Sequence, residues 1–267
     1  MTLRKLLPDY SFAYQPLVSL LNHKPVACEL LLRHFDGVGI ETFLDTPELF
    51  NSHVIGLMKA KADVTKHLFL TQGVSSIFIN LTPNQISAPD FMLSLDAFYK
   101  NGISPSSVAI EVTEQFYAVD ESAFYTNLKE ARRRGHPIVV DDFGSGFSNF
   151  NYVRMLQPSI VKTDKSILES AMTDSYSREF LRNLVSFLRT VKCKVVIEGV
   201  EDKDYLNIAQ QCRADYLQGY LFGTPQDVER EMVDSSRKLV TLRTSSSVSD
   251  SGMLPTTPYW GSRDFPL

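Results

Sequence analysis

In Val139-Val140-Asp141-Asp142-Phe143-Gly144, an apolar run typical of a strand ends in two adjacent carboxylates and enters a Gly-Ser-Gly loop. Successive side chains of a strand point to opposite faces, so we expect one carboxylate to face inward and the other to lie at the rim. Paired carboxylates are costly to keep ionised unless a cation lies beside them. Apolar runs that end in an acid or an amide recur along the chain, and this recurrence predicts one shared site.

Apolar runs rich in β-branched residues alternate with helical patterns from residue 77 onward, which is typical of a parallel sheet with crossover helices. We predict strands at 77–81, 108–113, 137–142, 160–163, 194–199 and 214–219. We predict helices at 85–100, 120–134, 148–156, 174–192, 202–212 and 226–240, the last opening with a capping box at Thr224.

Two more strands are predicted upstream, at 12–20 and 26–33, and a helical region follows at about 47–70. The turn between these strands is too short for a crossover helix, so we expect them to be antiparallel neighbours. Eight strands in about 240 residues favour a closed, TIM-like (β/α)8 barrel whose first strand is antiparallel to the rest. A doubly wound open sheet is the structural alternative.

The composition is that of an ordinary soluble globular chain, with 267 residues, 43% hydrophobic and 22% charged. A net charge of −4 argues against a nucleic-acid polymer as the partner. No apolar run approaches the roughly 18 residues of a membrane span, and Met1–Asp9 lacks the features of a signal peptide. Three widely separated cysteines without metal spacing favour reduced core thiols and a cytoplasmic location. We expect residues 1–240 to form the barrel and the Ser/Pro/Gly-rich residues 241–267 to form a disordered tail.

Polar side chains occur at the end of strand after strand, where the active site of an α/β barrel lies. Taken singly, an acid at a strand end is more commonly a solvated rim residue or a helix cap, Glu201 and Asp142 above all. The recurrence is harder to explain in that way. In chain order the residues are Glu29 and Arg33, Asn80, Glu111 and Glu114, Asp141 and Asp142, Lys162, Glu198 and Glu201, and Gln218.

The clustered charges predict bound cations. Two like charges 4 Å apart repel by about 4 kcal/mol at an effective dielectric near 20. The five carboxylates of Glu29, Glu111, Asp141, Asp142 and Glu198 are neutralised by two divalent ions together with one lysine. Oxygen ligands without histidine or cysteine favour Mg²⁺ or Mn²⁺ over zinc. Two such ions about 3.5–4 Å apart are suited to in-line attack of water on a phosphodiester.

The motifs at these strand ends resemble those of the EAL-domain phosphodiesterases, which hydrolyse the bacterial second messenger cyclic di-GMP to its linear dinucleotide. The resemblance runs from Tyr14 to Pro225, and the order and spacing of the motifs are specific. The family fold is a barrel whose first strand runs against the others, in agreement with the predicted hairpin. The motifs are Tyr14-Gln15-Pro16, Glu29-Leu30-Leu31, Asn80-Leu81-Thr82, Glu111-Val112-Thr113-Glu114, Asp141-Asp142-Phe143-Gly144-Ser145-Gly146, Lys162-Thr163-Asp164, Glu198-Gly199-Val200-Glu201 and Gln218-Gly219-Tyr220.

The resemblance assigns a role to each of these residues. It implies that the metal ligands are Glu29, Asn80, Glu111, Asp141 and, at a second metal, Asp142. Glu198 corresponds to the acid beside the attacking water, Lys162 to the lysine that orients or activates this water, and Gln218 to a nearby glutamine. Gln15, Arg33 and Asp164 are assigned to substrate binding. Glu114 corresponds to the anchor of the Asp-Asp-Phe-Gly loop and Glu201 to a supporting acid. The resemblance also implies a homodimer, and calcium is expected to support binding better than turnover.

The departures from the family pattern are modest. Leu30 replaces the alanine of the signature, and Ser145 replaces a common threonine. Thr163 replaces a common isoleucine, and His34 replaces a common tryptophan beside Arg33. No carboxylate, amide or lysine of the catalytic set is missing, which favours hydrolysis. The alternatives are a catalytically inactive relative that binds cyclic di-GMP or a protein partner, and an unrelated metal-dependent barrel.

Overall fold

The computed structural model describes residues 10–35, 38–40, 42, 53–112, 120–145 and 150–228. The strands are β1 (Tyr10–Ser19), β2 (Pro25–Phe35), β3 (Val38–Gly39), β4 (Ile77–Leu81), β5 (Val108–Val112), β6 (Ile138–Phe143), β7 (Ile160–Thr163), β8 (Lys194–Ile197), β9 (Tyr216–Leu217) and β10 (Gln226–Asp227). The helices are α3 (Val54–Thr71), α4 (Pro83–Ser87), α5 (Phe91–Lys100), α6 (Glu121–Arg133), α7 (Phe150–Leu156), α8 (Lys165–Thr173), α9 (Ser175–Thr190) and α10 (Lys203–Gln211), with a 3₁₀ turn at Pro105–Ser107.

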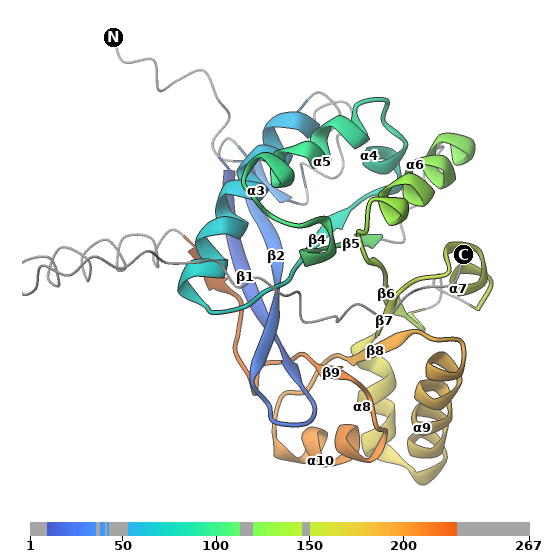
Figure 1. The fold of residues 1–267 in the computed structure, drawn as a ribbon. Helices are drawn as coiled ribbons and strands as arrows, with labels where there is room; N and C mark the ends of the chain where they lie inside the picture. The colour runs from blue at the N-terminus through green and yellow to red at the C-terminus, as the bar shows by residue number, and fades with distance from the viewer. Residues whose placement is uncertain are drawn as a thin grey trace, which may run out of the picture.

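Eight strands close into a barrel, as predicted from the alternation of elements (Figure 1). The hydrogen-bonded order is β1-β9-β8-β7-β6-β5-β4-β2, and the pairing of β1 with β2 completes the circle. The pairs from β2 through β9 are parallel, whereas β1 is antiparallel to both of its barrel neighbours. The expected closed barrel with an inverted first strand is therefore confirmed, and the open sheet is excluded.

The β1–β2 hairpin follows from its turn. His23 adopts a left-handed backbone with φ of 55°, and its N–H donates to the Ser19 carbonyl at 2.8 Å. A turn of this size leaves no room for a helix, so the second strand returns alongside the first. The pairing contains a register shift at Arg33, which falls between the paired residues Leu32 and His34.

The interior of the barrel is filled by a separate layer of buried apolar side chains. These residues are Leu17, Val26, Ala27, Phe78, Ala109, Val139, Ile160, Val196 and Tyr216. They come from every strand of the barrel, as expected when parallel strands face a packed core rather than a pore. The polar residues at the strand ends therefore lie next to a close-packed layer of apolar side chains.

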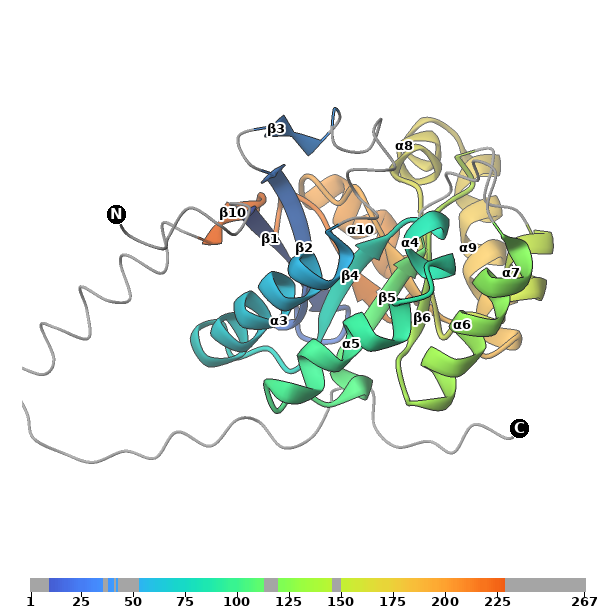
Figure 2. The same ribbon diagram turned by 90° about the horizontal axis from the view of Figure 1, so that it is seen from above.

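The helices lie around the outside of the strands (Figure 2). The helix predicted at 85–100 is divided into α4 and α5, because Ala88 is extended before Pro89, with φ of −61° and ψ of 141°. Helix α8 was not predicted. No helix among the described residues is long and apolar enough to cross a membrane.

The helix predicted at 226–240 is wrong at its start. Gln226 and Asp227 form strand β10 and pair with Tyr14 and Ala13 of β1. Strand β9 pairs with Val18 and Ser19 of β1, and β10 takes the adjoining stretch of the same edge, a pairing that outweighs the local helix-start signal at Thr224. Residues 229–267, which include the rest of that helix and the expected tail, lie outside the described residues.

Candidate active site

One buried lysine lies at the centre of the carboxylate cluster. Lys162, on β7, has a side chain that is 1% exposed. Its Nζ lies 2.8 Å from Glu111 Oε1, 2.8 Å from Glu198 Oε1, 3.1 Å from Glu29 Oε2 and 3.1 Å from Asp141 Oδ1. Four acids that are far apart in sequence thus meet around one ammonium group.

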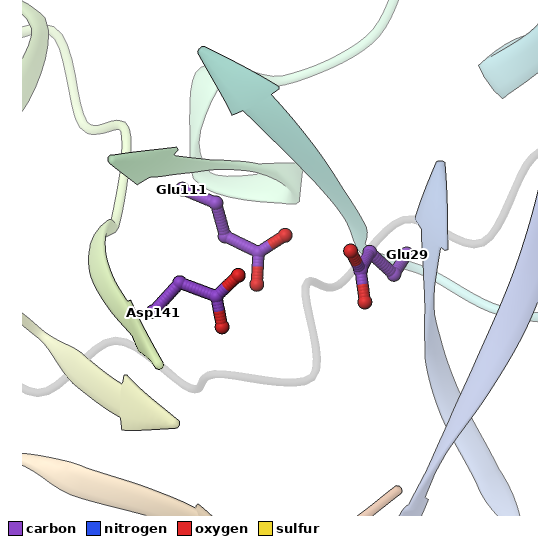
Figure 3. Close-up of side chains that lie close together, drawn as sticks. All are labelled: Glu29, Glu111 and Asp141. Carbon is purple, nitrogen blue, oxygen red and sulfur yellow. The ribbon is translucent and has the colours of Figure 1, made fainter. Parts of the chain in front are cut away.

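The barrel topology explains this convergence. Glu111 and Asp141 lie on the parallel neighbours β5 and β6, and Glu198 directly follows β8. Parallel strands present their carboxyl ends at the same mouth of the barrel. Figure 3 shows Glu29, Glu111 and Asp141 extending from three different strands toward the space between them. Glu111 and Asp141 lie near the ends of their strands, as predicted, whereas Glu29 lies in the middle of β2, which extends to Phe35.

The charges of the cluster are strongly coupled. Burial alone would lower the pKa of Lys162, but the surrounding carboxylates, Asp141 foremost, hold it well above its ordinary value. Burial raises the pKa of Glu111 well above its ordinary value, and Glu29 adds to the rise, while Lys162 opposes it. Burial likewise raises the pKa of Glu198 to about 8 despite Lys162. One lysine is therefore too little positive charge to keep all of these acids ionised.

Two side-chain amides hold Glu29 in place. Asn80 Nδ2 donates to Glu29 Oε1 at 2.8 Å, and Gln218 Nε2 donates to Glu29 Oε2 at 2.8 Å. Burial would raise the pKa of Glu29, but Lys162 and these two hydrogen bonds outweigh burial and lower it. Glu29 is therefore the member of the cluster that is best prepared to remain a carboxylate.

The side chain of Gln15 connects the site to a neighbouring loop. Gln218 Nε2 also donates to Gln15 Oε1 at 3.3 Å, and Gln15 Nε2 donates to the Gly223 carbonyl at 3.2 Å. A chain of hydrogen bonds thus runs from the loop after β9, through β1, to Glu29. The inverted first strand places Gln15 beside the cluster.

A bulge sets the positions of the adjacent aspartates. Val140 of β6 pairs with Val161, whereas Phe143 pairs with Thr163, so β6 has one extra residue at this point. Asp142 takes up the bulge with a left-handed φ of 48°. Bulges re-aim side chains near active sites. Asp141 is partly buried and Asp142 is exposed, but the bulge rather than regular alternation sets this difference, because oxygens of both residues lie within 4.8 Å of Glu198.

These residues fit a pair of hard divalent cations. Ligand oxygens of Glu29, Glu111 and Asp141 lie within 4.8 Å of one another, as do those of Asp141, Asp142 and Glu198. Two buried oxygens, Glu111 Oε2 and Gln218 Oε1, have no hydrogen-bond donor among the described residues. The donor set is carboxylate and amide oxygen, which suits Mg²⁺ or Mn²⁺.

The other predicted site residues belong to the local structure around the strands. Arg33 is half-buried at the bulge of β2. Asp164 caps α8, where its Oδ1 accepts from the Ser166 N–H at 2.9 Å. Glu201 is exposed and is not the cap of α10, because Asp202 Oδ1 accepts from the N–H groups of that helix. Glu114 lies outside the described residues.

Sequence reasoning missed Lys61, which is on α3 and is 2% exposed. Its Nζ donates to the Asn80 carbonyl at 2.8 Å. Burial lowers the pKa of Lys61 to about 7, although the charge of Glu111 opposes the change. The signal that could have revealed it is positional: Lys61 falls on the buried stripe of α3 together with Leu57, Met58 and Leu68.

Comparison with known proteins matches the part of the chain that contains these site residues. A family model described as EAL domain matches residues 4–225. The probable cyclic di-GMP phosphodiesterase PdeA of Escherichia coli strain K12 is 32% identical over 130 residues, which are 48% of this chain and 18% of PdeA. The chain thus spans about a fifth of the length of this curated relative.

Solved structures share the barrel. The PaMucR phosphodiesterase in complex with c-di-GMP is 26% identical with a TM-score of 0.70, over 83% of this chain and 98% of that one. Klebsiella pneumoniae BlrP1 in a manganese/cy-diGMP complex at pH 6 is 25% identical with a TM-score of 0.73, over 85% of this chain and 58% of that one.

Proposed function

This chain belongs to the EAL domain family, and from that premise we propose that it hydrolyses cyclic di-GMP to the linear dinucleotide 5′-pGpG. The observation that carries the proposal is the convergence of Glu29, Glu111, Asp141 and Glu198 on Lys162, each within 3.1 Å of its Nζ. The relative PdeA is named a probable cyclic di-GMP phosphodiesterase, which supports the substrate.

In the proposed site, Glu29, Asn80, Glu111 and Asp141 would hold one divalent ion, and Asp142 would contribute to a second. When bound, Mg²⁺ or Mn²⁺ would supply Lewis-acid polarisation of the phosphodiester and a water of lowered pKa. Water adds to phosphorus as one P–O3′ bond breaks, which leaves a 5′-phosphate and a free 3′-hydroxyl.

The protein side chains would position the reactants and balance charge. Glu198 is beside Lys162 and would accept a hydrogen bond from the attacking water. The ammonium of Lys162 would stabilise negative charge that develops on the phosphoryl oxygens. Gln218 would orient the water through its free Oε1, since its Nε2 is already engaged by Glu29.

Substrate recognition is assigned to three residues around the mouth. Gln15 and Arg33 would contact guanine or phosphate, and Asp164 would bind from the start of α8. The bulge at Arg33 gives this side chain a direction that regular strand alternation would not. Glu114 and Glu201 are proposed to support the loops around the site.

Incubation with cyclic di-GMP tests the proposed function. With Mn²⁺ or Mg²⁺, chromatography should show conversion to pGpG. Chelation should abolish the reaction, and Ca²⁺ should slow it at least about 10-fold because it prefers looser coordination. Calorimetry in Ca²⁺ should still detect nucleotide binding. Tight binding without cleavage in Mn²⁺ would instead favour the inactive receptor.

We further propose that the protein is a cytoplasmic homodimer that associates through exposed aromatic side chains on α7 and α9. Phe150 is 55% exposed and Phe187 is 45% exposed, and their ring centroids are 5.2 Å apart. Tyr176 and Phe180 extend the same helix surface at a spacing of four residues. Phe143, at the end of β6, contacts Phe150 with centroids 5.6 Å apart, which links this surface to the aspartates.

Light scattering tests this assembly. Phe187→Glu should shift the protein from dimer to monomer at micromolar concentration, because a charge in an apolar interface is poorly solvated. Leu21→Glu is the matched control, since Leu21 is 93% exposed in the β1–β2 turn. A Phe187→Glu variant that stays dimeric contradicts the assignment of the surface.

A further inference from the structure

We infer that Lys61 is a positioning residue for Asn80, a role that rests on the proposed metal-dependent function. Lysine is almost never fully buried unless it is paired. Helix α3 nevertheless places this residue on its core-facing stripe, between Met58 and Thr65. A buried lysine is an exception to the apolar composition of protein cores, and an exception of this kind beside a candidate site indicates a functional role.

The contacts of Lys61 lead directly into the site. Its Nζ donates to the backbone carbonyl of Asn80 at 2.8 Å. The side chain of the same asparagine donates through Nδ2 to Glu29 Oε1 at 2.8 Å. Two successive contacts therefore join a helix outside the barrel to a carboxylate inside it.

The location of Asn80 makes its orientation sensitive to this contact. Asn80 is the penultimate residue of β4, and it is paired in register with Glu111 of β5. Beyond the strand, Thr82 and Gln85 form a capping box that fixes the start of α4. Lys61 secures the strand end from the α3 side. With Nδ2 committed to Glu29, Asn80 Oδ1 is the amide atom that is left to ligate a cation.

A purely structural role for Lys61 makes a different prediction from a positioning role. If Lys61 only closes the end of β4, its loss lowers stability and leaves metal affinity unchanged in the folded protein. If it orients Asn80, its loss weakens metal binding, because residues that hold a ligand in place commonly contribute 10–100-fold to affinity. Its positive charge acts in the opposite direction, so tighter binding after its removal would show that repulsion is the larger effect.

Manganese binding without substrate separates these cases. We expect Lys61→Met to raise the Mn²⁺ dissociation constant at least about 10-fold by electron paramagnetic resonance. Lys61→Arg, which keeps the charge and the donors, should recover part of the loss. Thr65→Val is the matched control. Thr65 is buried on the same helix, and its Oγ1 donates at 2.7 Å to the backbone carbonyl of Lys61 rather than contacting Nζ.

The outcomes are distinguishable from failure of the proposed function. Measurements are made well below the melting temperature of each variant, so that only folded protein is compared. Unchanged or tighter Mn²⁺ binding by Lys61→Met, or an equal loss in Thr65→Val, overturns the inference. A wild-type protein that binds no Mn²⁺ overturns the metal-dependent function itself, and the inference with it.

Discussion

Replacing Lys162 by methionine should reduce cyclic di-GMP hydrolysis by roughly 10³-fold, because a group that stabilises transition-state charge is lost, and it should destabilise the metal-free protein. Methionine has nearly the length of lysine, so the change removes the charge and little volume. Four carboxylates lie within 3.1 Å of the lost ammonium. Removal of one partner from a buried ion pair costs about 3–5 kcal/mol, and here the uncompensated charge is shared by several acids.

Urea unfolding in a chelator, with and without added Mn²⁺, measures the stability effect. Added Mn²⁺ should restore much of the lost stability, since a bound cation replaces the missing positive charge. The deficit should also narrow as the pH falls from about 8 to about 5, because the uncompensated carboxylates can then take up protons. A variant as stable as wild type in chelator at about pH 8 would contradict the central role of Lys162.

Replacing Glu111 by glutamine should reduce hydrolysis about as strongly as Lys162→Met does. Unlike Lys162→Met, it should not destabilise the metal-free protein. The side chain of Glu111 is fully buried, and its pKa lies well above 4.5 because of burial and the nearby Glu29. When the pKa of a carboxyl is higher in the folded than in the unfolded protein, the free energy of unfolding falls as the pH rises above the unfolded pKa. The neutral isostere removes this penalty, so the metal-free variant should keep its stability or gain about 1–2 kcal/mol at about pH 8.

The same substitution should weaken Mn²⁺ binding by at least about 100-fold, since a carboxylate ligand is lost from the site. Calorimetry of metal binding and urea unfolding in chelator give the two readouts on one sample. Asp174→Asn is the control. Asp174 caps α9, because its Oδ1 accepts from the Ser177 N–H at 2.8 Å. This variant should be less stable than the wild type but should bind Mn²⁺ equally well. A clear loss of stability in Glu111→Gln would show that the acid serves the fold rather than the ions.

The barrel and most of its site could be predicted because strand ends leave a local mark. The strands at Ile77–Leu81 and Ile160–Thr163 begin and end where the apolar runs do. Each run ends near Asn80 or Lys162, so the polar position is visible without a structure. Once the strands are parallel, their ends must meet at one mouth.

The remaining features depend on contacts that no local pattern contains. Helix α8 follows β7 after a single residue, Asp164, so no loop signal separates them. Strand β10 forms because β1 offers an edge, and the shift at Val140–Phe143 appears only when two strands are paired. Lys61 resembles a solvated helical lysine in the sequence, because its neighbours Lys59 and Lys66 are also basic.

The inverted first strand determines toward which mouth of the barrel the two ends of the described chain lie. Tyr10 pairs with Phe35, the last residue of β2, so the polypeptide enters the barrel on the reactive side rather than the opposite one. Strand β10 pairs with Tyr14 and then with Ala13, so it runs toward the same side. Tyr10 and β10 therefore lie toward the mouth of the barrel that holds the carboxylates, rather than toward its opposite end. A partner that contacts either segment would act on the same mouth of the barrel as the carboxylates, and its effect would not have to cross the packed interior.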